Sequence, residues 1–288
     1  MDYLIHLAIF VSIYAILALS LNLVVGFTGL LSVTHAAFYG IGAYAVAILS
    51  VSFGMNFFLA LLVGIAFSAL FALLIGIVLS KFKGDYYALG SLGFNVIVWS
   101  IFLNWHELTR GPLGIPGIHR PELFGFTFHE NVAFLFLSAV LLAVIFFACE
   151  KIAKSSFGRV LKAIREDEEA IAVFGYNIAY YKLAIFVISA GMAAIAGALF
   201  GSYITFIDPS TFTVNESIFL LAVIILGGLS SNKGAFLGAL ILVLLPEFLR
   251  FVGFPSEIAA QMRQVVYGLL LVILMLYRPQ GLVGEYKL

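Results

Sequence analysis

Charged residues are scarce in this sequence of 288 residues. Asp, Glu, Lys and Arg make up 10% of it, whereas a soluble domain has about a quarter. Acidic and basic residues are equal in number, 15 each, and no basic tract of the kind that neutralises phosphates is present, so we expect no nucleic-acid partner. Hydrophobic residues make up 63% of the chain. Because so much apolar surface must face lipid, the sequence predicts an integral membrane protein.

Cysteine and catalytic motifs are also missing or rare. The single cysteine, Cys149, lies in an apolar run, which excludes an intramolecular disulfide and a thiolate metal site. The HExxH motif of zinc proteases, a GxSxG motif with a plausible histidine partner, and the P-loop GxxxxGK[ST] are absent. An intramembrane enzyme therefore has no catalytic pair to work with. We expect a non-catalytic protein that needs no cofactor or metal ion and does not itself bind ATP.

The hydrophobic residues gather into long runs. A helix needs about 20 mostly apolar residues to cross the hydrocarbon core of a membrane. Cutting the chain at its charges and turn clusters predicts an all-α integral membrane protein with about 8–9 transmembrane helices. It would form a single polytopic domain over residues 1–288. The predicted spans are 3–25, 28–50, 57–80, 85–103, 132–149, 183–207, 217–230, 234–250 and 262–277.

Glycines interrupt two of these segments. Gly26 and Gly29 stand at the start of segment 26–50, and Gly227 and Gly228 lie near the end of segment 217–230. We expect one or both segments to be a broken helix or a re-entrant segment. Both breaks are followed by an Ala-Phe-x-Gly sequence, at 37–40 and 235–238. Breaks in corresponding halves indicate a translocation site in a repeated transporter, although chance similarity explains so short a match as well.

The distribution of Lys and Arg predicts the orientation, because short cytoplasmic loops retain these residues. Segment 150–182 is the richest and is therefore expected to be cytoplasmic. Counting spans from it places eleven of the 15 basic residues inside and four outside, the latter being Arg110, Arg120, Arg250 and Arg263. With nine crossings the amino terminus is outside and the carboxyl terminus inside. One re-entrant segment would instead move the amino terminus inside.

The connection 104–131 is then external. Its prolines and glycines, among them Pro112, Pro116 and Pro121, predict a turn-rich loop of fixed shape. Such a loop suits the docking of a partner, and it equally suits a connector without one.

Polar groups inside the predicted spans are few, and each is costly in hydrocarbon unless it has a partner or lines water. We select Asn22, Thr34, His35 and Asn95 as candidate residues of a translocation pathway. A hydrogen-bonded packing role is the alternative for His35. Glu216 falls at the end of a predicted span, where water can reach it, so we expect no charged site near the midplane. That weakens the case for a carrier driven by protons or sodium.

Small residues recur at every fourth position in two spans. They predict seams where helices pack closely, because helices in lipid associate through such stripes. The residues are Gly64, Ser68, Ala72 and Gly76 in one span and Ala193, Gly197 and Gly201 in the other.

The segment 157–175 is charged yet periodic. Val160, Leu161, Ile164, Ile171 and Phe174 recur at steps of mainly three and four residues, which predicts short amphipathic helices on the cytoplasmic face. Gly175 is expected to stop the last of them. The segment fits either a solvated connector or the groove of a partner protein.

Glu169-Ala170-Ile171-x-x-x-Gly175 resembles the EAA-x-x-x-G signature of ABC importer permeases, with Ile171 in place of the second alanine. The surrounding sequence is similar to the branched-chain amino-acid permease family, LivM type, over nearly the whole chain. The segments that carry this resemblance are 21–32, 35–44, 156–159, 165–168, 227–228 and 278–282.

This resemblance implies a permease subunit of an ABC importer in the bacterial or archaeal cytoplasmic (inner) membrane, moving branched-chain or related small amino acids. It implies as partners a second, LivH-like permease, two ATPase subunits and an extracytoplasmic substrate-binding protein. Relatives in the family also carry urea or short amides, and a stand-alone carrier or channel is the alternative from another class. The residues that would couple to the ATPase are Arg165, Glu166, Asp167, Glu169, Ala170 and Gly175.

Overall fold

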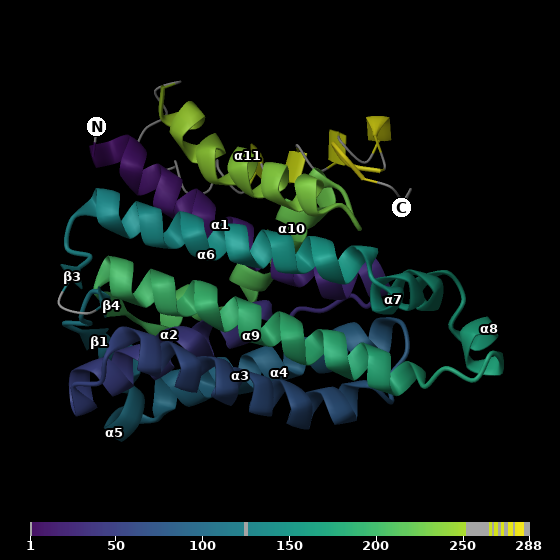
Figure 1. Ribbon diagram of the computed structural model, residues 1–288, viewed down its shortest axis with the longest axis horizontal. Coiled ribbons are helices and arrows are strands. Elements are labelled where there is room, and N and C mark those ends of the chain that lie inside the picture. The colour runs from purple at the N-terminus through teal and green to yellow at the C-terminus, as the bar shows by residue number, and fades with distance from the viewer. Residues whose placement is uncertain are drawn as a thin grey trace.

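The protein is almost entirely helical (Figure 1). The computed structural model describes residues 2–123, 126–251, 265–266, 268–269, 272–273, 276–278 and 280–284. Half of the predicted last span, 262–277, and Arg263 lie outside these residues. The long helices are α1 (Asp2–Thr28), α2 (His35–Phe53), α3 (Phe57–Leu79), α4 (Asp85–Asn104), α6 (Asn131–Lys154), α9 (Ile178–Ile204), α10 (Val214–Gly227) and α11 (Asn232–Phe251). The short ones are α5 (His106–Thr109), α7 (Ser156–Glu166), α8 (Glu168–Val173), η1 (Gly111–Leu113) and η2 (Pro209–Phe212).

Six of the described helices, α1, α2, α3, α4, α6 and α9, are long and apolar enough to cross a membrane. The helices α10 and α11 meet that condition only as a pair, and their axes are bent by 119° at the break between them. The all-helical architecture and a broken segment are therefore confirmed. The described residues hold six candidate spans, or seven if the bent pair counts as one.

The second predicted span, 28–50, needs a correction at its start. The chain leaves helix at Thr28 and re-enters it only at His35. Residues 29–34 between them form neither helix nor strand. Gly26 and Gly29, from which a broken or re-entrant segment is predicted, lie beside or within this break.

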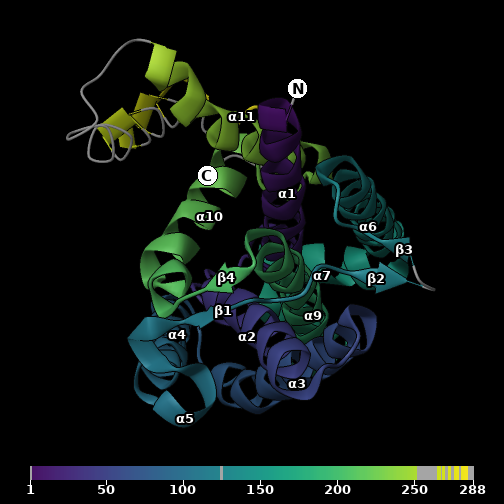
Figure 2. The same ribbon diagram turned by 90° about the vertical axis from the view of Figure 1, so that its left-hand side faces the viewer.

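Three helices form the middle of the bundle. In the most apolar stretches of α1, α2 and α9, 61%, 67% and 67% of the residues are buried, against 28%, 33% and 28% in α3, α4 and α6. Figure 2, seen along the bundle, shows α1, α2 and α9 surrounded by α3, α4, α6 and α10. The outer helices therefore present apolar side chains to lipid or to a partner within the membrane.

The predicted small-residue seams are confirmed. Gly64, Ser68, Ala72 and Gly76 are all buried on α3, and Ala193, Gly197 and Gly201 are buried on α9. A side chain at Gly197 would overlap the backbone carbonyl of Tyr39 on α2. The two central helices thus approach each other backbone to backbone.

The two ends of the bundle carry different short elements. The helices α7 and α8 lie at one end, and the amino terminus and the strands lie at the other (Figure 1). The connection 104–131 is the turn-rich loop that its prolines predicted, since no described helix in it exceeds the four residues of α5. Strand β1 (Ile115–Pro116) in this loop pairs antiparallel with β4 (Phe206–Ile207), and β2 (Glu122–Leu123) pairs with β3 (Phe126–Thr127).

The connection from α9 to α10 turns back into the bundle before α10 begins. Phe212 in η2 is fully buried, and its ring packs against Tyr39 and Tyr44 of α2 at centroid distances of 5.1 and 5.8 Å. The first turn of α10 consequently lies inside the bundle and not at its end. Glu216 is at a helix end, as expected, yet its carboxyl group accepts a hydrogen bond from Tyr14 near the middle of α1.

Candidate functional site

The first helix break, residues 29–34, is held by side chains from α4. In lipid, backbone N–H and C=O groups outside a helix need partners within the protein. The backbone N–H of Val33 donates to Ser91 Oγ at 2.9 Å, and Asn95 Nδ2 donates to the Val33 carbonyl at 2.8 Å. Ser91 and Asn95 are both fully buried. The extended segment therefore exchanges the hydrogen bonds of a helix for bonds to α4.

Ser217 of α10 completes the polar cluster at the start of α2. Its Oγ accepts a hydrogen bond from the backbone N–H of Ala36 at 2.9 Å and another from Asn95 Nδ2 at 2.8 Å. Three separate elements, α2, α4 and α10, therefore meet at one buried hydroxyl.

His35 opens α2 and links it to α1 and α9. Its Nε2 lies 2.9 Å from Ser189 Oγ, and that hydroxyl donates to the Ser20 carbonyl at 2.6 Å. A hydroxyl has one hydrogen to donate, so His35 must donate from Nε2. Its Nδ1 is buried without a hydrogen-bond partner among the described residues. Beside it, Thr34 Oγ1 and Ser32 Oγ are 2.9 Å apart.

The second break, residues 228–231, packs against the end of α1. Gly228 has φ of +114°, a backbone conformation that side chains disfavour. The backbone N–H of Ser230 donates to Asn22 Oδ1 at 3.1 Å, and Ser230 Oγ donates to the Gly26 carbonyl at 2.6 Å. A side chain at Gly26 would overlap Asn22 and the backbone of Ser230. The glycine thus permits the contact between α1 and this break.

Residues near the carboxyl terminus close the second break from the other side. The backbone N–H groups of Leu282 and Val283 donate to the carbonyls of Leu226 and Gly227, each at 3.0 Å. The last carbonyls of α10, which have no partner within the helix, are satisfied in this way.

Arg165 of α7 joins both breaks. Its guanidinium donates to the Gly26 carbonyl at the end of α1 and to Ser230 Oγ in the second break, the latter at 3.3 Å. Its side-chain carbons also lie against Gly29, the first residue of the first break. A single cation therefore connects the segment 150–182 to the two places where the membrane helices are interrupted.

The amphipathic helices predicted in this segment are confirmed as α7 and α8. The helix α7 buries Leu161 and Ile164 against the bundle. The helix α8 ends at Val173, and Gly175 follows with φ of +84°, which confirms the expected stop. Val173 and Phe174 are 88% and 78% exposed. Because α8 contacts little besides α7 and α9, its apolar side chains point away from the membrane bundle.

The acidic residues between the two helices have separate contacts. Asp167 Oδ1 caps α8 by accepting from the backbone N–H groups of Glu169 and Ala170, each at 3.0 Å. Glu168 pairs with Lys182 at 2.6 Å, where the lysine side chain is 5% exposed. Glu169 is 90% exposed and lies 3.9 Å from Lys83, a pair of little energetic weight. Glu169 is therefore open to a partner.

The sequence-predicted residues thus fall into three groups. Thr34, His35 and Asn95 come together at the first break. Asn22 lies instead at the second break, with all four fully buried. The predicted break glycines, Gly26, Gly29, Gly227 and Gly228, lie at or beside the two breaks, and Arg165, Glu166, Asp167, Glu169, Ala170 and Gly175 lie on or beside α7 and α8.

Sequence reasoning missed three serines that bond near the interrupted segments. Ser217 accepts from the Ala36 N–H, Ser230 donates to the Gly26 carbonyl, and Ser189 bonds to His35 and to the Ser20 carbonyl of α1. A serine within an apolar stretch of sequence is the one pattern that could have indicated such a role, but Ser138 and Ser202 also lie in apolar stretches. Only the fold separates the two kinds, because Ser138 bonds within its own helix and Ser202 Oγ has no partner among the described residues.

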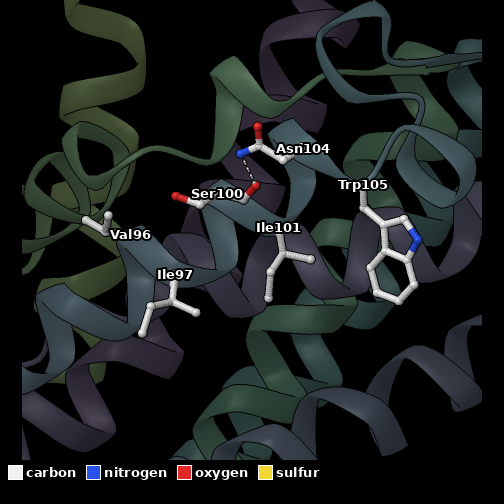
Figure 3. Close-up of a pocket in the computed structure, with 6 residues that line it drawn as sticks. All are labelled: Val96, Ile97, Ser100, Ile101, Asn104 and Trp105. Carbon is white, nitrogen blue, oxygen red and sulfur yellow. Dashed lines mark hydrogen bonds between the residues drawn. The ribbon is translucent and has the colours of Figure 1, made fainter.

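Two hollows lie near these elements. One of 510 Å³ lies beside the second break and is lined by polar and charged residues, including Glu150, Lys154, Lys162 and Lys233. The other, of 550 Å³, lies on the outer face of α4, and Figure 3 shows its lining of Val96, Ile97, Ser100, Ile101, Asn104 and Trp105. Asn104 donates to the Ser100 carbonyl of its own helix, and the rest of the lining is mainly apolar. Within the described ranges no three His, Cys, Asp or Glu side chains could hold a metal ion.

Known proteins that this chain resembles are described as transport permeases. A family model described as "Branched-chain amino acid transport system / permease component" matches residues 3–275. The high-affinity branched-chain amino acid transport system permease protein LivM of Escherichia coli (strain K12) is 36% identical over 301 residues, covering 96% of this chain and 69% of that protein. The LivH permease of the same organism is 28% identical, covering 95% and 92% of the two chains.

The BraD permease of Pseudomonas aeruginosa, from a system of the same description, is 26% identical with the same coverage, 95% and 92%. No solved structure matches this chain.

The hydrogen bonds at Ser217 yield a stability prediction. Replacing Ser217 with Ala leaves the Ala36 N–H and one Asn95 N–H buried without an acceptor, which we expect to cost roughly 1–3 kcal/mol of folding free energy. Replacing Ser202 with Ala is the matched control, since its buried hydroxyl has no partner among the described residues, and it should be neutral. Thermal unfolding of the purified protein in detergent measures both. Equal stability of the two variants would mean that Ser217 does not support the break.

Proposed function

This chain belongs to the branched-chain amino acid transport permease family, and from that premise we propose how it works within an importer. It is the permease component of a branched-chain amino acid ABC transport system, a multi-pass membrane protein without a catalytic site. The observation that carries this assignment is the family match over residues 3–275. ATP hydrolysis is the work of other subunits.

The proposed assembly combines this chain with a second, LivH-like permease, two ATPase subunits and an extracytoplasmic substrate-binding protein, in a bacterial or archaeal cytoplasmic membrane. The similarity to both LivM and LivH supports it, because both names come from one transport system. The exposed apolar side chains on α3, α4 and α6 are also compatible with lipid and a second permease as neighbours.

For the topology we propose nine crossings in a single polytopic domain. The bend of 119° supports counting α10 and α11 separately. Leu282 and Val283 bond to the carbonyls at the end of α10, which supports placing these residues on the same side of the membrane as the second break. Nine crossings place Asp2 outside, loop 104–131 outside, and loop 150–182 in the cytoplasm with the carboxyl terminus.

Cysteine labelling tests this topology. In a variant with Cys149 replaced by Ser, a cysteine replacing Ser155 should react with a membrane-impermeant maleimide only from the cytoplasmic side. A cysteine replacing Gly117 should react only from outside, because α6 crosses the membrane once between the two loops. Labelling of both positions from the same side would contradict the proposed number of spans.

Coupling to the ATPases is proposed to run through α7 and α8. The exposed Glu169, Val173 and Phe174 offer a charge and an apolar surface to a partner. The buried Leu161 and Ile164 attach α7 to the bundle, and Arg165 bonds to both helix breaks. Movement of α8 with a closing ATPase would thus reach the two interrupted segments directly.

Variants of this loop test the coupling. We expect Glu169→Lys to place an unpaired or like charge in a desolvated contact, at a cost on the order of 2–5 kcal/mol. Gly175→Val should disturb the turn, since valine disfavours a left-handed conformation, even though the space around Gly175 is open. Both variants should insert and dock the external protein, yet lose ATP-dependent uptake and ATPase co-purification together.

Asp85→Lys is the matched control, because Asp85 is also an exposed acid, at the start of α4. It should retain uptake and ATPase binding. Normal uptake and ATPase retention in both loop variants would mean that 159–175 is only a solvated connector.

The transported molecule is proposed to be a branched-chain amino acid, as in the systems that name LivM, LivH and BraD. Urea or a short amide is the alternative cargo within the family. Reconstitution with the neighbouring subunits, followed by ATP-dependent uptake of leucine against urea, tests the cargo. We expect leucine uptake that needs both ATP and the binding protein. Uptake of urea alone would reject the cargo, and leucine uptake without ATP would favour a stand-alone carrier.

A further inference from the structure

An acidic side chain lies deep in the bundle. Glu216 Oε1 accepts a hydrogen bond from the hydroxyl of Tyr14 on α1 at 2.7 Å. At a rise of 1.5 Å per residue, Tyr14 is about 18 Å from one end of α1 and about 21 Å from the other. The carboxyl group is therefore near the middle of a helix that spans the membrane. The inward turn of η2 explains how the first residues of α10 reach this depth.

No cation of the described chain neutralises Glu216. The ion pairs Lys182–Glu168, Lys154–Glu150 and Lys83–Glu169 all lie at the α7 and α8 end of the bundle. Tyr14 is the one side chain in the described ranges that donates a hydrogen bond to Glu216, which leaves Oε2 without a donor. A carboxylate at membrane depth is costly unless it is paired or serves a function.

Tyr39 of α2 supplies a second unsatisfied group beside it. This residue is fully buried, and its hydroxyl has no hydrogen-bond partner among the described residues. Its ring packs against Phe212, which lies four residues before Glu216 in the chain, at a centroid distance of 5.1 Å. The three side chains come from α1, α2 and α10, which contact one another (Figure 2). A buried hydroxyl without a partner and a carboxylate with one donor thus lie on helices that pack together.

Aromatic rings surround these polar atoms. The Tyr39 ring packs on Phe200 and Phe212 at centroid distances of 5.5 and 5.1 Å, and the Tyr14 ring meets the edge of Phe219 at 5.6 Å. Glu216 and Tyr14 are each only partly buried, so the cluster is open on one side. Aromatic faces attract cations and also bury apolar side chains.

We infer that Glu216, Tyr14 and Tyr39 form a binding site for the ammonium group of the transported amino acid. An ammonium group has three hydrogens to donate and nothing to accept. The free Oε2 and the Tyr39 hydroxyl are acceptors, and the surrounding rings suit an apolar side chain next to the charge. This inference rests on the proposed function, because it names the part of the substrate that the permease holds in transit.

A site for the ammonium group also lowers the cost of moving a zwitterion through an apolar path. A zwitterion loses the hydration of both charges when it enters an apolar path, and a single fixed carboxylate restores part of that loss for the ammonium group. One such contact holds the substrate loosely enough for it to leave again, as transport requires.

Protection from chemical labelling tests the inference on the unmodified chain. Dicyclohexylcarbodiimide reacts with carboxyl groups in apolar surroundings, and peptide mass spectrometry locates the product. The purified complex with its ATPases and partner permease is labelled in the presence of leucine, of 4-methylpentanoate, which lacks the ammonium group, or of 3-methylbutylamine, which lacks the carboxylate. We expect leucine and the amine to slow the labelling of Glu216 and the acid not to. Glu247 on α11 is the control, and its labelling should not change.

Equal effects of the three compounds on Glu216, or no effect of any, would overturn the inference. Leucine uptake by the same complex is measured first, so a failure of the proposed function is recognised separately from a failure of this site.

Uptake by variants gives a second, independent measurement. Glu216→Gln should lower ATP-dependent leucine uptake about tenfold, equivalent to about 1.4 kcal/mol, while ATPase activity stimulated by the binding protein persists. Glu216→Asp should restore part of the uptake, since it keeps the charge, and Glu247→Gln should behave as the unmodified chain. Unchanged uptake in Glu216→Gln would show that the carboxylate does not hold the substrate.

Discussion

The requirement that every backbone polar group find a partner inside the protein governs this structure. In hydrocarbon, water cannot supply the missing hydrogen bonds, so a membrane helix can stop within the bundle only where side chains take over. At residues 29–34 the partners are Ser91 and Asn95, and Ser217 accepts from the Ala36 N–H in the first turn of α2. At residues 228–231 Asn22 accepts from the Ser230 N–H. The amides of Leu282 and Val283 donate to the last carbonyls of α10, just before this break. The few polar residues of an apolar chain are concentrated at the places where the helices are interrupted.

The two breaks are not independent of each other. Arg165 bonds to Gly26 and Ser230, and Asn22 bonds to Ser230 as well. The end of α1, which leads into the first break, is therefore fastened to the second break. In an importer whose ATPases close and open, one element that contacts both interruptions allows them to change together. Bistable helix positions of this kind are a common basis of conformational switching.

Composition and hydropathy were sufficient to predict the helical membrane fold, because lipid imposes a strong and simple constraint on span length. The break glycines and the amphipathic pair α7 and α8 followed from local patterns. The site was harder, since Ser217 and Ser202 look alike in the sequence and differ only in what surrounds them. Glu216 was misjudged for a related reason. Its position at a helix end was visible, whereas the inward turn at Phe212 that buries this helix end depends on long-range packing.

The pairing of β1 with β4 has a mechanical consequence. It joins loop 104–131 to the residues that follow α9, and the amides of Gly117 and Ile118 reinforce the joint by donating to the Thr205 carbonyl at 3.0 and 3.2 Å. Loop 104–131 and the segment that leads into α10 are thus joined as one mechanical unit. In the proposed importer, a binding protein docked on this loop would act through the polypeptide on the first turn of α10. Such a contact would link the arrival of cargo to the position of Glu216 before any ATP is hydrolysed.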